Sequence, residues 1–395
     1  MPEIGFENLF AALLWPVAAL WLLALLWTVY CLRRQKNLEI SSVRQTPSER
    51  PFVSIIVPVR NEAGRILEKS VSSMLAQTYE NFELIALDDR STDDTRKVLE
   101  KLKIKNPKLI IVEGAKTAGG WLGKPFALEQ AFKHSKGEWI LAADADIVFA
   151  PETLQTAVSY AEENAFDALT LVPRQIFGSF WERLFMPVFG WFCLLIMPLH
   201  RVNDPRKKAS TGVGNFFMLR RAVLEKIGGF ASVKAEVAED LKLAEIIKSE
   251  NFRLRVDYAE FIETRMYRGL GEIWQGFTKN LFSGMKFSVS KTVFGAASIL
   301  FFGVLPPVLA AAVLIGGSFA LFLPFAAAYF FQVLTFFFVN RRWRGSAFYA
   351  LLAPAGLALF LLILINSARR VLSGKGVEWK GRAIYEKGGV RPPAG

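Results

Sequence analysis

The apolar residues of this chain are arranged in two ways. Long uncharged stretches lie near both ends, whereas the region from Phe52 onward alternates short apolar runs with segments of helical spacing. The short runs predict strands at 53–57, 82–87, 109–112 and 139–143, and the spacing predicts helices at 65–77, 94–102, 125–134 and 241–247. Alternating strands and helices predict an α/β fold with a mostly parallel sheet, whose ligands bind at the carboxyl ends of the strands.

The first uncharged stretch runs from Leu9 to Leu32. As a helix it would be roughly 36 Å long at about 1.5 Å per residue, which is enough to cross a bilayer. Arg33, Arg34 and Lys36 follow it, whereas a signal peptide carries its charges before the apolar run. We therefore expect an uncleaved anchor whose C-terminal end faces the cytoplasm.

The C-terminal region contains three more candidate spans, at 293–315, 319–339 and 346–365. With a cytoplasmic soluble domain, the arginines at 341, 342 and 344 fall inside, as the positive-inside rule requires. A third full crossing would place the basic residues from Arg369 to Arg382 outside, against the same rule. Either one segment is re-entrant or the number of spans differs by one, and the sequence leaves both alternatives open.

Two further apolar segments are expected to lie at the membrane surface. Residues 176–199 are aromatic but interrupted by charges and prolines, which favours an interfacial segment over a buried helix pair of the soluble domain. A second segment carries apolar residues at helical spacing beside two lysines, which is typical of a basic helix in the headgroup plane. Its residues are Ile273, Trp274, Phe277, Leu281 and Phe282, with Lys279 and Lys286.

Composition agrees with a membrane protein. Hydrophobic residues make up 52% of the 395 residues, and the mean hydropathy is +0.28. The net charge is +12, from 48 basic and 36 acidic residues. Because basic residues flank membrane spans, this surplus does not indicate a nucleic-acid partner. Cys31 and Cys193 lie in apolar segments and indicate neither a disulfide framework nor a zinc site.

A pair of carboxylates follows the predicted strand at 139–143. Asp144 and Asp146 are two residues apart, so an extended backbone would place both on one face at the strand end. Two adjacent carboxylates stay ionised at low cost only beside a cation. Oxygen ligands favour Mg²⁺ or Mn²⁺, ions that often bridge carboxylates to phosphates of a substrate.

A second acidic cluster follows the predicted strand at 82–87. Its spacing imitates a calcium loop, but Asp94 stands where such a loop requires glycine, and a strand precedes it instead of a helix. We expect Thr92 or Asp93 to be the N-cap of the next helix, which leaves Asp88 and Asp89 available at the strand end.

Two more segments carry candidate chemistry. Residues 117–125 form a glycine-rich loop that lacks P-loop spacing but brings Lys124 and backbone N–H groups close to a phosphate. Glu239 and Asp240 precede an amphipathic helix. Carboxylates there are stabilised by the helix dipole, and either that role or a general-base role accounts for them.

Together these motifs resemble the family 2 glycosyltransferases of GT-A fold, a Rossmann-like architecture. The likeness covers about 52–267 and rests on five motifs in order: Val57–Glu62, Asp88–Asp93, Gly123-Lys124, Asp144-Ala145-Asp146 and Glu239-Asp240. Residues 212–221, with Gly228-Gly229-Phe230, resemble the acceptor-side strand and turn of that family. Lipid-modifying members are similar to this chain in having an N-terminal anchor and C-terminal spans.

The resemblance implies a role for each motif. Pro58, Glu62, Asp88 and Asp89 would bind the donor nucleotide, and Lys124 its base or diphosphate. Asp144 would serve the ribose side and, with Asp146, hold Mg²⁺ or Mn²⁺ as a Lewis acid. Asp240 would be the general base. The acceptor side would comprise Gly214, Asn215, Glu239, Trp274 and Gln275. The donor implied first is a UDP-sugar, and the acceptor a membrane lipid.

One departure from the family pattern separates two activities. Processive synthases carry Q-x-x-R-W on an interfacial helix, whereas here Gln275 is followed by Thr278 and Lys279 at the arginine and tryptophan positions. This favours inverting transfer of a single sugar over a processive polysaccharide synthase. The tail 376–382 resembles glycosyltransferases of carotenoid or hopanoid lipids. A transporter or scaffold with a degenerate nucleotide-binding domain is the alternative of another class, and it predicts a lost motif carboxylate.

The expected organisation follows. Residues 1–36 are the membrane anchor, 52–267 the GT-A catalytic domain, 268–291 the amphipathic interfacial helix, 292–368 the transmembrane helices and 369–395 a basic tail. The expected location is the inner (plasma) membrane, as a multi-pass protein with a cytoplasmic catalytic domain.

Overall fold

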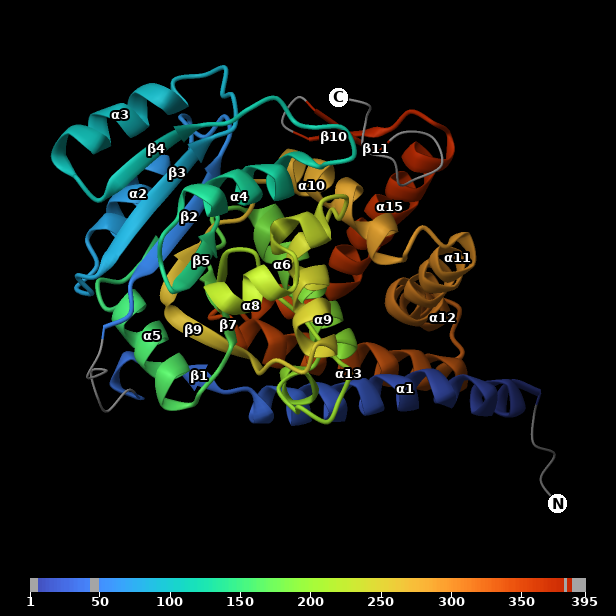
Figure 1. Ribbon diagram of the computed structural model, residues 1–395. Helices are drawn as coiled ribbons and strands as arrows, with labels where there is room; N and C mark the ends of the chain where they lie inside the picture. The colour runs from blue at the N-terminus through green and yellow to red at the C-terminus, as the bar shows by residue number, and fades with distance from the viewer. Residues whose placement is uncertain (1–5, 43–49, 380–381, 386–395) are drawn as a thin grey trace. The chain divides into compact units, whose positions relative to one another are not determined.

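The computed structural model describes residues 6–42, 50–379 and 382–385 (Figure 1). Contacts divide the chain into two units. The helical unit comprises the chain up to Arg34, Phe177–Pro198 and Tyr267–Val377. The sheet unit comprises Gln35–Ile176 and Leu199–Met266. The chain leaves the sheet unit after β7 and returns to it before β8, so one helical segment is inserted between two of its strands.

The sheet unit is built on one nine-stranded mixed sheet in the order β1-β9-β7-β8-β5-β2-β3-β4, with β6 paired to β9. Its strands are β1 (Asn37–Leu38), β2 (Val53–Val59), β3 (Phe82–Asp88), β4 (Leu109–Glu113), β5 (Trp139–Ala143), β6 (Ile147–Phe149), β7 (Ala168–Gln175), β8 (Phe216–Arg220) and β9 (Leu254–Thr264). Strands β2 to β5 are parallel, whereas β8 is antiparallel to both of its neighbours. The predicted α/β class and the four predicted strands are confirmed.

Helices cover both faces of the sheet. They are η1 (Ile40–Ser42), α2 (Leu67–Leu75), α3 (Thr95–Lys105), α4 (Gly123–His134), α5 (Thr153–Glu163), α7 (Leu199–Val202), α8 (Arg221–Lys226), η2 (Gly229–Val233) and α9 (Glu239–Ser249). Successive strand residues point to opposite faces, so Ile55 packs with α2, α3 and α5, while Ile56 packs with α4, α8 and α9. Burial on both faces explains why these strands read as continuous apolar runs.

The topology places the acidic motifs at one edge. From β2 the chain continues through β3 and β4 on one side, and then crosses to β5 on the other side of β2. Such a reversal of strand order opens a crevice at the carboxyl ends of the strands. Asp88 ends β3 and Asp144 follows β5, so both carboxylates lie at that edge.

The start of α3 differs from expectation. The helix begins at Thr95 and its N-cap is Asp94, whereas the sequence analysis expected Thr92 or Asp93. The Asp93 carboxylate accepts the Thr95 N–H at 3.0 Å and the Ala63 N–H at 3.1 Å, because the chain turns tightly before the helix. Asp93 therefore ties the loop after β2 to the start of α3.

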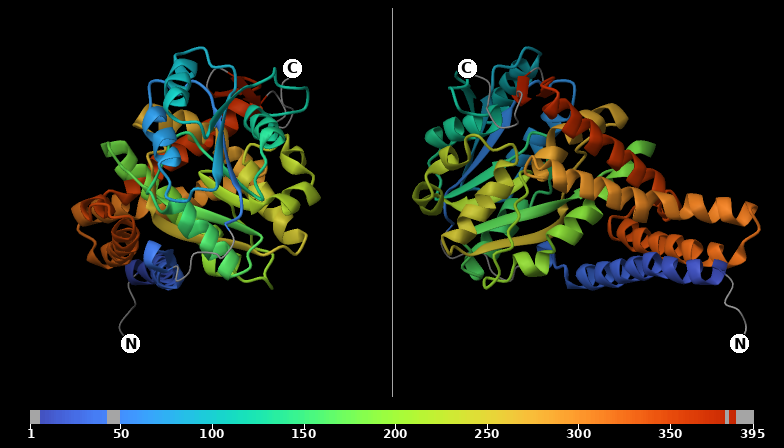
Figure 2. Two further views of the ribbon diagram at one scale, coloured as in Figure 1. Left: turned by 60° about the vertical axis from the view of Figure 1, so that its left-hand side comes forward. Right: turned by 90° about the vertical axis from the view of Figure 1, so that its right-hand side faces the viewer.

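The helical unit contains the long apolar helices (Figure 2). They are α1 (Phe6–Arg34), α6 (Phe180–Ile196), α10 (Leu270–Gly284), α11 (Val289–Ser298), the π-helix η3 (Ile299–Val304), α12 (Leu305–Ile315), α13 (Phe319–Arg342), α14 (Phe348–Leu351) and α15 (Ala353–Leu372). Among the described residues, five segments are long and apolar enough to cross a membrane: Ala11–Arg34, Phe180–Val202, Val289–Ile315, Phe319–Arg342 and Ala353–Leu372.

The π-helix is caused by two prolines. Pro306 and Pro307 lack the N–H groups that would bond the carbonyls of Phe302 and Gly303 in an α-helix. Side chains of two other helices replace them. Trp21 of α1 donates its Nε1–H to the Phe302 carbonyl at 2.6 Å, and Gln332 of α13 donates to the Gly303 carbonyl at 2.8 Å. These bonds join α1, η3 and α13 through backbone carbonyls.

Helix α6 continues through Pro187, where the sequence suggested an interruption. A proline is tolerated because neighbouring helices stabilise the segment. Within the helical unit Trp191 bonds the Thr28 hydroxyl of α1 at 3.0 Å, and Phe185 stacks on Phe360 of α15 at 5.8 Å. The segment therefore packs with the long apolar helices, and it is not a helix pair buried in the sheet unit.

The segment after α13 turns back within the helical unit. Gln332 of α13 bonds the Gly303 carbonyl, and these two residues are about equally far along the chain from the turn after Ile315. Helix α13 therefore runs antiparallel to the helix before it and ends near the start of α11. Tyr329, near the middle of α13, donates to the Leu351 carbonyl at 2.9 Å. Ser367, near the end of α15, donates to the Thr278 carbonyl of α10 at 2.6 Å. Since α10 directly precedes α11, α15 returns to the end at which α13 stopped.

Helix α10 carries the apolar face that the sequence predicts, but its partners are protein side chains. Ile273, Phe277, Leu281 and Phe282 are buried. The Phe277 ring lies 4.6 Å from Phe185 of α6. Trp274 is half-buried and Gln275 is exposed.

Candidate active site

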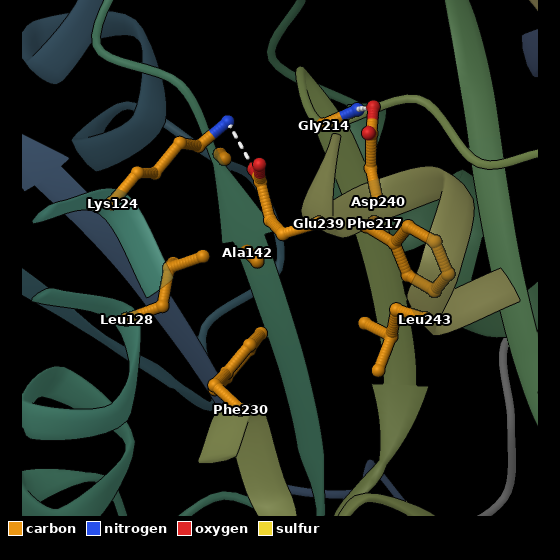
Figure 3. Close-up of a pocket in the computed structure, with 10 residues that line it drawn as sticks. Lys124, Leu128, Ala142, Gly214, Phe217, Phe230, Glu239, Asp240 and Leu243 are labelled. Atoms are coloured by element: carbon orange, nitrogen blue, oxygen red, sulfur yellow. Dashed lines mark hydrogen bonds and ion pairs between the residues drawn. The ribbon is translucent and has the colours of Figure 1, made fainter. Parts of the chain in front are cut away.

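A lysine joins three structural elements at the crevice of the sheet unit, and Figure 3 shows its ion pair with Glu239. Lys124 lies in the first turn of α4, and its ammonium is 2.8 Å from Asp144 Oδ1 and 2.7 Å from Glu239 Oε1. Asp144 follows β5, and Glu239 is the first residue of α9. Asn215, at the start of β8, donates to Asp144 Oδ2 at 3.0 Å. Residues from four sequence motifs therefore meet in one hydrogen-bonded network.

Charge explains why the lysine is stably held. Burial lowers the pKa of the Lys124 ammonium, but the negative charges of Asp144, Glu239 and Asp240 outweigh that effect and raise the pKa well above its usual value. The lysine is therefore a permanent cation among three acids. Its side chain is 37% exposed, so a ligand can reach it.

Asp240 is oriented by backbone N–H groups. Its Oδ2 accepts the Gly214 N–H at 2.8 Å, and its Oδ1 accepts its neighbour's N–H, that of Leu241, at 2.9 Å. Burial and then the Glu239 charge raise the pKa of Asp240 to about 6, while the Lys124 charge and the two hydrogen bonds oppose that rise. A carboxylate with a pKa near 6 is ionised at neutral pH and is a stronger base than an ordinary aspartate.

The glycines of the 212–215 loop permit this close approach. A Cβ atom on Gly214 would lie 2.9 Å from Lys124 Nζ and 3.3 Å from Asp240 Oδ2. A Cβ atom on Gly212 would meet the Asp240 carbonyl oxygen and the Phe217 ring. A larger residue at 214 would displace the lysine or the carboxylate, and one at 212 would displace the Asp240 backbone or the Phe217 ring, which explains the glycine at both positions.

Below the charged groups lies a pocket with an empty volume of about 280 Å³, counting the space at its open mouth (Figure 3). Its wall is apolar and comprises Leu128, Ala142, Ala143, Phe217, Phe230 and Leu243. Apolar surroundings exclude water, which is consistent with the raised pKa of Asp240. Our sequence reasoning missed Leu128 and Leu243, although a signal was present: they follow Lys124 and Asp240 by four and three residues, one helical turn along α4 and α9.

The residues predicted for the nucleotide form a second group at the ends of β2 and β3. Asp88 Oδ1 accepts the Ser91 N–H at 3.0 Å, and the Asp88 carbonyl accepts the Gly114 N–H at 2.9 Å. Asp89 is buried, and Arg60 donates to its carbonyl at 2.7 Å. Pro58 in β2 pairs in register with Leu87.

Glu62 is buried beside the same loop. Its N–H donates to Thr95 Oγ1 at 2.8 Å, and its carboxylate lies 3.7 Å from Arg65. The two acid clusters are thus anchored separately, the first on β2, β3 and α3, the second on α4, β5 and α9. The remaining predicted residues, Trp274 and Gln275, belong to α10 of the helical unit.

The D-x-D pair contains the two carboxylates that the sequence predicted for a metal ion, Asp144 and Asp146. Asp144 has a 28% exposed side chain and already binds one cation, the Lys124 ammonium. The Asp146 carbonyl accepts the Thr264 hydroxyl at 3.0 Å, which fixes its backbone to β9. In the described part of the chain, no three His, Cys, Asp or Glu side chains gather as a metal cluster. Two carboxylates fit an ion that takes its other ligands from a diphosphate and water, as Mg²⁺ does.

Comparison with known proteins identifies the fold. The structure resembles the mannosyltransferase PcManGT from Pyrobaculum calidifontis, solved in complex with GDP-Man and Mn²⁺, with a TM-score of 0.52 and 21% sequence identity. The match covers 91% of this chain and 98% of that one. The sheet unit therefore has a GT-A fold, as the sequence predicted.

The sequence identifies the family of that domain. Residues 54–228 match the profile described as glycosyl transferase family 2, so the chain contains a glycosyltransferase family 2 domain.

Curated relatives match part of this chain. The Escherichia coli UDP-Glc:alpha-D-GlcNAc-diphosphoundecaprenol beta-1,3-glucosyltransferase WfgD is 39% identical over 114 residues, which are 29% of this chain and 42% of that protein. The beta-monoglucosyldiacylglycerol synthase of Nostoc sp. is 29% identical over 215 residues, which are 52% of this chain and 42% of that protein. The chain spans less than half the length of either relative.

Proposed function

We propose that this protein transfers a single sugar from a nucleotide-diphosphate donor to a membrane lipid, with inversion at the anomeric carbon. The observation that carries the proposal is that Asp240, bound to Gly214, lies beside the network of Lys124 and Asp144 at the carboxyl edge of the sheet, where its charge acts on Lys124. It combines a cation for phosphate, a carboxylate for a metal ion and a base for an acceptor hydroxyl.

The charge of each side chain indicates which part of the donor it binds. Asp144 and Asp146 would hold Mg²⁺ or Mn²⁺, which supplies the Lewis acid that neutralises the leaving diphosphate. Lys124 binds a phosphate oxygen as a second cation. Asp88, Asp89 and Glu62, with Pro58, bind the nucleoside side. The neighbours that support a nucleotide-sugar donor are named for GDP-Man and UDP-Glc, and we propose a UDP-sugar first.

Asp240 removes the acceptor proton. A hydroxyl attacks the anomeric carbon from the face opposite the leaving nucleotide, and Asp240 accepts its proton as the new C–O bond forms. One displacement inverts the configuration. Gly214 orients the Asp240 carboxylate, and Asn215 orients the carboxylate of Asp144. Trp274 and Gln275 of α10 are proposed to contact the acceptor.

A lipid acceptor is supported by the helical unit and by the relatives. The two relatives are named for a diphosphoundecaprenol-linked sugar and for diacylglycerol, both membrane lipids. Asp88, Asp144, Asp146 and Asp240 are all retained, which counts against a degenerate scaffold. Within the tail that resembles carotenoid and hopanoid enzymes, Lys380 and Gly381 lie outside the described residues.

The proposal is tested with the full-length protein in lipid nanodiscs containing total lipid from its host. Labelled UDP- and GDP-sugars are supplied with Mn²⁺, and organic-soluble product is identified by mass spectrometry and its anomeric configuration by NMR. We expect a lipid carrying one additional sugar of inverted configuration. A water-soluble polymer would establish the processive alternative, and failure to bind any nucleotide would favour the scaffold.

We further propose that the sheet unit is cytoplasmic at the inner membrane and that three helices cross the bilayer: α1, α11–α12 and α13. Helix α6 starts after β7 and ends before β8, and these strands are hydrogen-bonded neighbours, so both ends of α6 lie on one side. The segment from α14 to α15 is re-entrant, because α15 returns to the end at which α13 stops. Every basic cluster beside these helices then faces the cytoplasm.

Single cysteines test this arrangement after Cys31 and Cys193 are replaced by serine. An impermeant maleimide added to spheroplasts should label Gly316→Cys, in the turn after α12. It should label Lys103→Cys and Lys375→Cys only after permeabilisation. Labelling of Lys375→Cys from outside would show that α15 crosses, and labelling of Lys103→Cys from outside would contradict the cytoplasmic domain.

A further inference from the structure

Lys124 links Asp144 and Glu239 through two ion pairs, which we call the lysine bridge. Its three side chains differ in how exposed they are. The side chain of Glu239 is 8% exposed, that of Asp144 is 28% exposed and that of Lys124 is 37% exposed. Glu239 is fixed in the first turn of α9, whereas Asp144 stands at the open end of β5. A ligand entering the crevice therefore reaches the Asp144 end of the bridge before the Glu239 end.

Two cations compete for the Asp144 carboxylate. Its Oδ1 binds the Lys124 ammonium at 2.8 Å. A divalent ion bound by Asp144 would compete with that ammonium, because two cations on one carboxylate repel each other. Glu239 offers the ammonium a second partner at 2.7 Å, so Lys124 need not leave the site when Asp144 is taken.

We propose that Glu239 is a positioning residue that keeps Lys124 in the site while Asp144 passes from the lysine to a metal ion. The inference rests on the proposed function, since it assumes that a metal ion and a diphosphate bind here. Glu239 acts through Lys124: it presents the ammonium to a phosphate oxygen of the donor and contacts no reacting atom. Lys124 would neutralise Asp144 when no metal ion is bound there, and phosphate oxygens of a bound donor would balance both cations.

Two consequences distinguish this role from a structural one. Without nucleotide, a metal ion has to displace Lys124 from Asp144, so removal of the lysine charge strengthens binding of the metal alone. With nucleotide, removal of either Lys124 or Glu239 weakens binding. The loss on changing Glu239 requires Lys124 to be present, because Glu239 has no separate contact with the donor.

The experiment is a double-mutant cycle on the full-length protein in nanodiscs. Binding of UDP and of GDP is measured by calorimetry at saturating Mn²⁺ for wild type, Lys124→Met, Glu239→Gln and the double variant. We expect each single change to weaken binding about tenfold, typical of a charge-assisted bond, and the double variant to match Lys124→Met. Glu245→Gln is the matched control on α9, since Glu245 is exposed, and it should bind like wild type.

Binding of Mn²⁺ alone is followed by electron paramagnetic resonance. Lys124→Met should bind the ion more tightly than wild type. Additive losses in the cycle, or wild-type nucleotide binding by Glu239→Gln, would overturn the positioning role, as would unchanged Mn²⁺ binding by Lys124→Met. Glu239→Asp retains the charge and should keep most of the affinity, which separates lost charge from misfolding. If the wild type binds neither nucleotide, the proposed function itself fails, and this inference with it.

Discussion

The raised pKa of Asp240 makes the role of this residue measurable. If Asp240 is the general base, the transfer rate follows the fraction of Asp240 that is ionised. With a pKa of about 6, that fraction is about 0.9 at pH 7 and about 0.09 at pH 5. The rate should therefore fall about tenfold between these pH values. An aspartate with its ordinary pKa of 3.8 would lose less than about a tenth of its rate over the same range.

The direction of the pH dependence follows from which protonation state of Asp240 is active. A base must be deprotonated to accept a proton, so the rate rises with pH and levels off above about pH 7. Burial and the Glu239 charge raise this pKa. Glu239→Gln should accordingly move the rising limb of the profile to lower pH.

The assay is transfer of labelled sugar into organic-soluble lipid, measured from pH 5 to pH 8 at donor concentrations well below saturation, where the rate reports kcat/KM and therefore the pKa of the free enzyme. Asp240→Asn removes the acceptor of the proton. It should lower the plateau of the pH–rate profile by about 10²–10⁴-fold and abolish the rise of the rate between pH 5 and pH 7. Nucleotide binding should change little, because Asp88, Lys124 and the metal carboxylates are intact.

A different role predicts a different pattern. If Asp240 only stabilises the N-terminus of α9, its replacement would cost about 0.3–1 kcal/mol of stability and leave turnover near normal. Near-wild-type turnover in Asp240→Asn would refute the base assignment, whereas a flat profile between pH 5 and pH 7 in the wild type would refute the raised pKa of Asp240. In the first case Glu239 or Glu236 would be the next candidate.

Three other substitutions test separate parts of the site. Asp146→Asn should abolish donor turnover, as should excess EDTA on the wild type; full activity in EDTA would contradict a metal requirement. Gly214→Ala places a methyl group within about 3 Å of Lys124 Nζ and should lower turnover more than donor binding, because it also displaces Asp240; an unchanged turnover would show that the loop can relax. Trp274→Glu should weaken use of a lipid acceptor far more than background hydrolysis of the donor, and equal loss of both in a rate assay would point to a folding defect instead.

The sequence predicted much of the sheet unit because its signals are local. The strand at 139–143 has the predicted bounds, and the D-x-D motif follows it directly. Lys124 and Asp240 were found as separate motifs. Their shared network was not predictable, since Lys124 and Glu239 meet only after α4 and α9 pack on the same face of the sheet.

The helical unit was harder to predict because hydropathy measures composition alone. The segment α14–α15, which we propose to be re-entrant, is as apolar as a crossing helix, and only contacts such as Tyr329 with Leu351 show that it turns back. Helix α6 was read as interrupted because Pro187 breaks helices in water, whereas tertiary packing maintains it here. The apolar face of α10 was assigned to lipid, but α6 covers Phe277.

The hydrogen bonds around the π-helix make the N-terminal helix more than an anchor. Trp21 completes the backbone of another candidate span, so replacing α1 with an unrelated apolar helix would leave the Phe302 carbonyl without this donor, at a cost of several kcal/mol if the segment lies in hydrocarbon. The order of synthesis suits this dependence, because α1 is made long before the prolines at 306 and 307. Deleting α1 to obtain a water-soluble enzyme should instead yield a protein whose remaining spans assemble poorly, even though the glycosyltransferase domain itself is untouched.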